Sequence, residues 1–163
     1  MNDTVLPYSA QEVLDFWFGS KDTPGYGESR AEWFQKNEAF DDGIRQRFGG
    51  LHAAAAHGML DYFWKDNPEG NLALVIVLDQ FSRQLYRGDA KAFAQDAHAL
   101  KLAKHAIDQG FDKDAIPVHR TFWYLPFEHS ENLEDQDRCI ELFKPLGNAE
   151  WTRYAEEHRA VIA

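Results

Sequence analysis

Hydrophobic residues recur every three or four positions along most of the chain, which is the spacing of one face of an α-helix. Between residues 38 and 57 this stripe consists of Phe40, Ile44, Phe48 and Leu51. Further helices are predicted over residues 9–19, 67–87, 96–110, 114–125 and 130–143, and from 149 onward, and no stretch is a credible β-strand. We therefore expect an all-α fold of short antiparallel helical pairs, forming a single domain over residues 1–163.

Capping residues and prolines set the expected helix ends. Asn67, Asp96 and Ser130 each precede a helical pattern, and their side chains are typical N-caps. Pro126 is expected to break the helix that begins near residue 114, because proline lacks an N–H donor and clashes with the preceding turn.

The most hydrophobic stretch of the chain is LALVIVL, residues 72–78. Its composition alone would also suit a buried strand. The Asn67-Pro68 start signal upstream, and the continuation of the stripe to Phe81 and Leu85, favour a helix. Since this helix is apolar on every side in its first half, we place it at the centre of the core.

Polar residues follow this stretch directly, and they are the first candidates for a ligand site. Asp79, Arg83 and Arg87 share one helical face, and Gln80 lies beside them. A purely structural interpretation is that Asp79 pairs with Arg83 one helical turn away. The functional interpretation is a pocket floor in which the two arginines grip a carboxylate or phosphate. The sequence leaves both open.

A second polar cluster lies between residues 119 and 131. His119 and Trp123 share a helical face and are candidate ligand-binding residues. Glu128 and His129 are candidate catalytic residues, because a histidine flanked by carboxylates can act as a general acid or base. The structural alternative is that Ser130 caps a helix and His129 only satisfies a backbone carbonyl.

Charge and composition narrow the function classes. The chain has 17 Lys and Arg against 27 Asp and Glu, a net charge of −10, which argues against binding to nucleic acid or to anionic membranes. A single cysteine excludes an internal disulfide and a cysteine-rich zinc site. We identify no metal-binding motif and no cofactor-binding loop. The N-terminus lacks a signal-peptide pattern and no apolar run approaches membrane-spanning length, so we expect a cytoplasmic protein.

Several short pieces stand in one order over nearly the whole chain. They are Phe16-Trp17-Phe18-Gly19, Trp33-Phe34, Phe40-Asp41, Arg47-Phe48, Leu78-Asp79-Gln80-Phe81 with Arg83, Arg87-Gly88, Gly110-Phe111-Asp112, and Leu125-Pro126 with His129-Ser130-Glu131. In this order and spacing they resemble the bacterial domain of unknown function 924 family. The resemblance implies a tetratricopeptide-like array of helices and supplies no activity.

The chain departs from the family pattern in two respects. Members commonly have proline where this chain has Ser82, and asparagine where it has Gln84. They also tend to continue beyond the position of Ile162 with a segment rich in Arg, Phe and His. If that segment normally closes over the Asp79–Arg87 face, the predicted site is incomplete here.

Three function hypotheses remain from the sequence. The first, which we prefer, is a binding module for a small anionic ligand or a peptide, anchored by Arg83 and Arg87. The second is a small hydrolase-like or acid/base enzyme that uses His129 or Glu128, with the arginines stabilising negative charge. The third is an assembly role, in which exposed aromatic residues bury a homo-oligomer interface. The enzyme hypothesis requires His129 and Arg83 to meet in one concave pocket.

Overall fold

The computed structural model describes residues 9–163, and every regular element within that range is helical, as the hydrophobic spacing predicts. The longer helices are α1 (Ala10–Phe18), α2 (Glu38–Ala56), α4 (Pro68–Val75), α6 (Asp96–Asp108), α7 (Pro117–Glu128), α8 (Leu133–Phe143) and α9 (Ala149–Ile162). The shorter elements are η2 (Ala31–Trp33), α3 (Asp61–Trp64), η3 (Ile76–Phe81), α5 (Ser82–Leu85), η4 (Ala90–Phe93) and η5 (Lys144–Leu146). Ser9 caps α1, since its side chain accepts a hydrogen bond from the Glu12 N–H.

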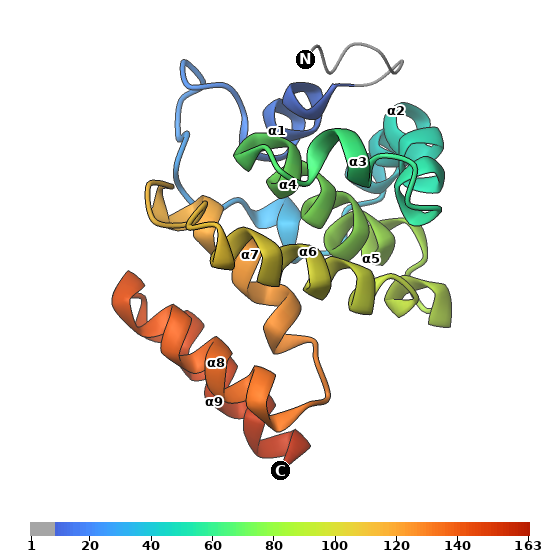
Figure 1. The fold of residues 1–163 in the computed structure, drawn as a ribbon. Helices are drawn as coiled ribbons and strands as arrows, with labels where there is room; N and C mark the ends of the chain where they lie inside the picture. The colour runs from blue at the N-terminus through green and yellow to red at the C-terminus, as the bar shows by residue number, and fades with distance from the viewer. Residues whose placement is uncertain (1–8) are drawn as a thin grey trace.

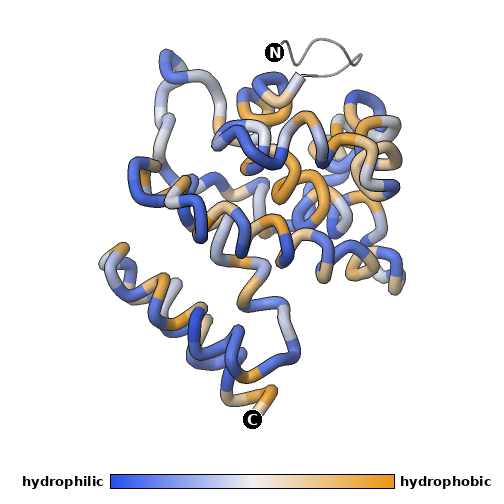
Figure 2. The backbone as a smooth tube through the Cα atoms, viewed as in Figure 1, coloured by the Kyte–Doolittle hydropathy of each residue, from blue (hydrophilic) through white to orange (hydrophobic). Residues whose placement is uncertain are grey.

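The continuous segment formed by α4, η3 and α5 lies at the centre of the molecule, and it is the most hydrophobic stretch of the backbone in Figure 2. Every residue from Leu72 to Leu78 is at most 2% exposed, so the predicted core helix is confirmed. Helices α1, α6 and α7 pack against α4, and α2 packs against η3 and α5 (Figure 1). The polar residues that follow Leu78 therefore begin in the buried centre of the molecule.

One turn of this segment, η3, is a π-helix. A π-helical turn is wider than an α-helical one and is often found at functional sites. It carries both Asp79 and Gln80. Since α4, η3 and α5 follow one another without a gap, the helix predicted over residues 67–87 is one continuous segment. Its widened turn lies where the chain changes from apolar to polar residues.

Three of the predicted helix ends are wrong. Asp96 is the first residue of α6, and its side chain makes no cap hydrogen bond because it binds Arg83 instead. The N-cap of α8 is Asn132, whose side chain accepts from the Glu134 and Asp135 N–H groups, while Ser130 donates to the Asp135 carboxylate. Helix α7 passes through Pro126 and ends only at Glu128. Proline in the last turn of a helix removes one backbone hydrogen bond, which does not suffice to end the helix two residues early.

Helices α8 and α9 form an antiparallel hairpin at one end of the molecule, joined to the rest mainly through α7 (Figure 1). The Trp151 ring of α9 stacks on Phe143 of α8 at 5.9 Å and meets the Phe34 ring edge-on at 5.3 Å. Through Trp151 and Phe34, α9 reaches back to the loop after η2. This arrangement encloses a space between α9 and the central segment.

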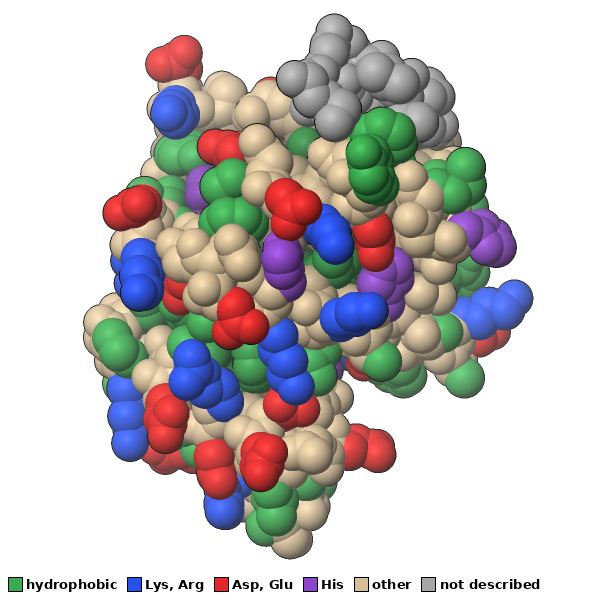
Figure 3. Space-filling view, in the orientation of Figure 1, with side chains coloured by type: hydrophobic (Ala, Val, Ile, Leu, Met, Phe, Trp, Pro, Cys, Tyr) green, Lys and Arg blue, Asp and Glu red, His purple; other side chains and the backbone are tan. Residues whose placement is uncertain are grey.

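The face of the molecule drawn in Figure 3 carries acidic and basic side chains interspersed, without one large area of a single sign. Within residues 9–163 no helix has both the length and the apolar character needed to cross a membrane. The tetratricopeptide-like arrangement implied by the family resemblance stays a prediction, as does the cytoplasmic location.

Candidate functional site

A cavity of about 610 Å³ lies between the polar end of the central segment and helix α9. Arg83 and Arg87 line one wall, and Glu128 and His129 line it from the C-terminal end of α7. The other wall is aromatic and is formed by Phe34, Trp151 and Tyr154. Asp79 supports this cavity from beneath, because its side chain is 1% exposed and hydrogen-bonds His129. The arginines of the first polar cluster and the Glu128–His129 part of the second therefore meet at one concave site, in the pocket that the enzyme hypothesis requires.

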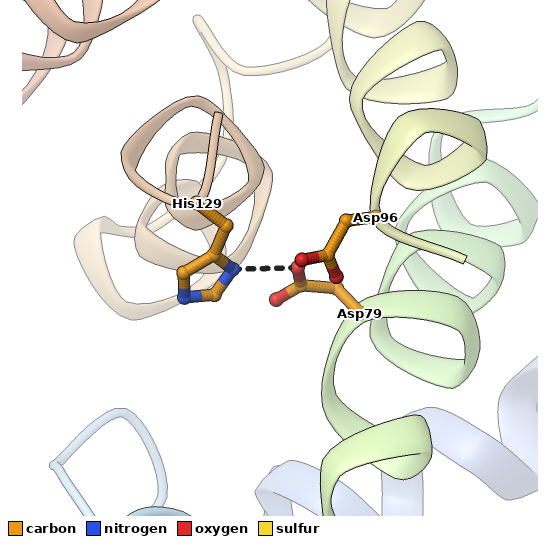
Figure 4. A group of neighbouring side chains, drawn as sticks. All are labelled: Asp79, Asp96 and His129. Atoms are coloured by element: carbon orange, nitrogen blue, oxygen red, sulfur yellow. Dashed lines mark hydrogen bonds and ion pairs between the residues drawn. The ribbon is translucent and has the colours of Figure 1, made fainter. Parts of the chain in front are cut away.

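His129 is held by a buried carboxylate. Its Nδ1 lies 2.7 Å from Asp79 Oδ1, and Figure 4 shows the two side chains pointing toward each other from α7 and η3. The Gln80 amide donates to the other oxygen, Asp79 Oδ2, at 2.7 Å. The structural alternative, in which His129 satisfies only a backbone carbonyl, is therefore wrong.

This contact sets the charge of both partners. Burial alone would raise the pKa of Asp79, but the neighbouring His129 and Arg83 hold it below its usual value. Burial likewise would lower the pKa of His129, but the Asp79 carboxylate raises it above 6.5. With Nδ1 donating to Asp79, the protonated ring has its second N–H, at Nε2, available at the cavity.

Arg83 is anchored mainly by Asp96 of α6. Its Nη1 and Nη2 donate to the two Asp96 carboxylate oxygens at 2.8 and 3.0 Å, and Nη1 also donates to the Asp79 carbonyl at 2.7 Å. The predicted Asp79–Arg83 ion pair exists but is longer, at 3.4 Å. Arg83 is therefore a fixed part of the cavity wall, with its side chain 22% exposed.

Asp79, Asp96 and His129 each place one atom capable of binding a metal within 4.8 Å of the others. The Arg83 guanidinium, however, already occupies both Asp96 oxygens, while Asp79 accepts from His129 and Gln80. All four carboxylate oxygens are thus engaged by protein donors. A cation could join this group only by displacing a positively charged side chain, so the arrangement fits an ion-pair network better than a metal site.

Arg87 is paired with Asp41 of α2. Its Nε and Nη2 donate to the two Asp41 oxygens at 2.7 and 3.3 Å. Asp41 is 6% exposed, whereas the Arg87 side chain is one-third exposed. No described residue accepts a hydrogen bond from Nη1 of Arg87, so this part of the guanidinium is available at the cavity.

Glu128 is a buried carboxyl group at the same site. Burial raises its pKa, and the nearby His158 opposes this shift only in part, since its Nε2 lies 3.9 Å from Glu128 Oε2. Glu128 Oε1 is buried without a hydrogen-bond partner among the described residues. A carboxyl group in this position retains its proton to higher pH than an exposed one and can donate a hydrogen bond.

The structure does not bring His119 and Trp123 to this cavity, which corrects their assignment to one shared site. Trp123 Nε1 donates to Asn71 Oδ1 at 2.9 Å, and His119 Nε2 lies 3.3 Å from the Tyr26 hydroxyl. Both residues line a separate cavity near α1. They share a helical face as predicted, but that face turns away from the arginines.

Several residues of the site were missed in the sequence. Asp41 is separated from Arg87 by 46 positions, and Trp151, Tyr154 and His158 come from the last helix. No local pattern pairs these residues with the central segment. The one available signal for Asp41 was its place on the hydrophobic face of α2. An acid buried there needs a basic partner, and a buried arginine needs a carboxylate.

Comparisons with known proteins identify a family but no activity. The family model of the bacterial protein of unknown function DUF924 matches residues 13–163. A solved structure, that of the protein of unknown function ATU0120 from Agrobacterium tumefaciens, is 37% identical with a TM-score of 0.83, covering 94% of this chain and 81% of that one. A search of curated proteins gave no match.

Proposed function

Since the chain belongs to the DUF924 family of bacterial proteins, whose function is unknown, we propose from its geometry that the cavity beside Arg83 and Arg87 binds a small molecule with an anionic group. The observation that carries this proposal is the Asp79–His129 hydrogen bond. It raises the pKa of the imidazole, which favours the protonated form, and it leaves Nε2 free at the wall that Arg87 also lines. The anionic group is a carboxylate or phosphate, because both accept from such paired donors.

The charges around the cavity support an anion over a cation. Arg83 and Arg87 are balanced by Asp96 and Asp41, so these two carboxylates are neutralised by the arginines that they hold. Burial raises the pKa of Glu128, which favours its uncharged form on the same wall. His129, whose pKa is raised, and the free edge of Arg87 then remain as donors for a ligand.

The aromatic wall supports a ligand with an apolar body. Phe34 and Tyr154 are 49% and 37% exposed, although both contact the half-buried Trp151 ring. When a ligand covers aromatic residues at a cavity, their apolar surface is removed from water, and this favours binding. An aryl or acyl anion would place its charged end at Arg87 and His129 and its body against these rings.

Binding of benzoate and phenyl phosphate, measured by isothermal titration calorimetry at pH 6, tests the proposal. Benzyl alcohol is the neutral counterpart. We expect at least one anion to bind and the alcohol to bind at least tenfold more weakly, since a charged hydrogen bond contributes about 1.5–3 kcal/mol. The double variant Asp41→Leu/Arg87→Met removes the guanidinium without leaving a buried unpaired charge, and we expect it to lose about tenfold or more in affinity.

Arg45→Met is the matched control, because Arg45 pairs with Asp42 on the exposed side of α2 and does not line the cavity. It should bind both anions like the wild type. The proposal is wrong if neither anion binds the wild type, or if the double variant and the control bind them equally well.

A second candidate function, acid/base catalysis, is favoured by the same Asp79–His129 pair. A carboxylate behind a histidine orients the ring and stabilises its protonated form, and Glu128 would supply a second acid. A panel of p-nitrophenyl carboxylate and phosphate esters tests it. Catalysis predicts turnover that His129→Gln abolishes, although the same variant only weakens benzoate binding, since Arg87 remains as a donor. If the wild type shows no turnover, binding remains the supported function.

A further inference from the structure

A second cavity, of about 630 Å³, shares no lining residue with the first. It lies where α1, the start of α4, the end of α6 and the start of α7 meet. Leu14, Phe18, Leu72 and Trp123, each at most 6% exposed, form its apolar floor. Tyr26 and Phe111 add two half-buried aromatic rings to its sides. The interior is thus apolar and largely aromatic.

The histidine at this cavity differs from His129 in having no carboxylate bound to it. The His119 ring packs against Phe18 with ring centroids 4.3 Å apart, and its Nε2 meets the Tyr26 hydroxyl. Burial lowers the pKa of His119; Glu69 opposes this shift without reversing it, and Lys21 adds to it. His119 is therefore neutral at pH 7, so it adds an aromatic face and no positive charge.

The rim of the cavity is acidic. Asp15, Glu69 and Asp114 line it against a single lysine, Lys21. Asp15 accepts from Gln11, whereas no described residue pairs with Glu69 or Asp114. Aromatic faces attract cations through their quadrupole, and carboxylates at the mouth act in the same direction. Two independent features therefore favour a positively charged ligand.

We propose that this second cavity binds a protonated amine with a flat apolar body, placing the body on Phe18, His119 and Trp123 and the ammonium group near Glu69. The site is independent of the anion site, and its ligand is of the opposite charge. An organic acid of the same shape would meet three carboxylates and one lysine, and would be rejected.

Three probes share an indole ring and differ in charge: tryptamine, its neutral counterpart tryptophol and its acidic counterpart indole-3-propionate. Calorimetric titration at pH 7 should give one tryptamine site per chain, weaker binding of tryptophol and the weakest binding of the acid. Glu69→Gln should weaken tryptamine binding about two- to fivefold, as for an exposed ion pair. Lys21→Gln should strengthen it, and Glu38→Gln, on the exposed start of α2, should leave it unchanged.

Ala115→Trp locates the probe. Ala115 lines the cavity and is half-buried, so the larger side chain fills the space without entering the core. We expect this variant to lose tryptamine binding while still binding benzoate, and benzoate not to displace tryptamine from the wild type. The proposal is overturned if tryptamine does not bind, if the acid binds as tightly as the amine, or if Ala115→Trp binds tryptamine like the wild type.

Discussion

The two halves of the central segment are stabilised in different ways. From Leu72 to Leu78 every side chain is apolar, and burial needs only neighbours of the right shape. From Asp79 to Arg87 most side chains are polar, and five of them are bound by a partner on another element: Asp79, Ser82, Arg83, Gln84 and Arg87. The first half thus forms the core, and the second half forms a wall of the cavity.

The difference shows what positions a site in this fold. A polar group that is buried without a hydrogen-bond partner destabilises the fold, whereas an apolar group needs no such partner. Asp79 meets this requirement by binding His129 and Gln80, and Ser82 meets it by accepting from His52 at 2.7 Å while donating to the Leu78 carbonyl. The partners come from α2, α6 and α7. The polar half therefore ties three helices together at the cavity.

The comparison is tested most strongly by removing Asp79. Asp79→Ala leaves the buried His129 without its carboxylate and removes the weaker partner of Arg83, so we expect the free energy of unfolding to fall by about 3–5 kcal/mol. Urea denaturation at pH 7 measures it. Asp42→Ala is the control, because Asp42 pairs only with exposed Arg45, and it should change stability by less than about 1 kcal/mol. Equal losses for the two variants would contradict a role for the network.

The packing of the apolar half is tested at Gly70. A Cβ atom there would lie 2.7 Å from the Trp64 carbonyl oxygen, which is backbone and cannot turn aside. We expect Gly70→Ala to lower stability by about 1–3 kcal/mol through overpacking. Gly49, inside α2, has open space around its Cβ position, so Gly49→Ala should raise stability by about 0.5–1 kcal/mol. Differential scanning calorimetry of the pair should show thermal midpoints that shift in opposite directions.

The smallest expected effect is on how stability depends on pH. It distinguishes His52 from His129, the two histidines that bind the polar half. Burial lowers the pKa of His52, so its contribution to stability is present above its ordinary pKa of 6.5 and is lost as pH falls. His129 has a raised pKa, so its contribution is present below 6.5 and is lost as pH rises through that raised value. Urea midpoints between pH 5 and 8 should fall less steeply toward acid in His52→Gln than in the wild type. A steeper fall in the variant would contradict the lowered pKa of His52.

The sequence predicted the apolar half well, because helix periodicity and a start signal at Asn67 are local properties. It also identified Asp79, Arg83, Arg87, Glu128 and His129 as candidates. It did not identify their partners, since Asp41 and Asp96 reach the arginines only through the packing of α2 and α6. Asp96 was instead expected to cap its own helix, the role that an acid at that position most often has. His119 and Trp123 were assigned to the same site because a one-dimensional pattern does not tell which side of α7 faces which cavity.

The most direct measurement is the pKa of each histidine, followed by NMR of the imidazole ring nitrogens as pH is varied. The account predicts that His129 titrates above 6.5, with Nδ1–H protected by Asp79, while His52 and His119 titrate below it. Benzoate should raise the His129 value further, because the anion binds the protonated ring more tightly. A His129 that titrates at or below 6.5, or that does not respond to a bound anion, would contradict the charged site on which the proposed function rests.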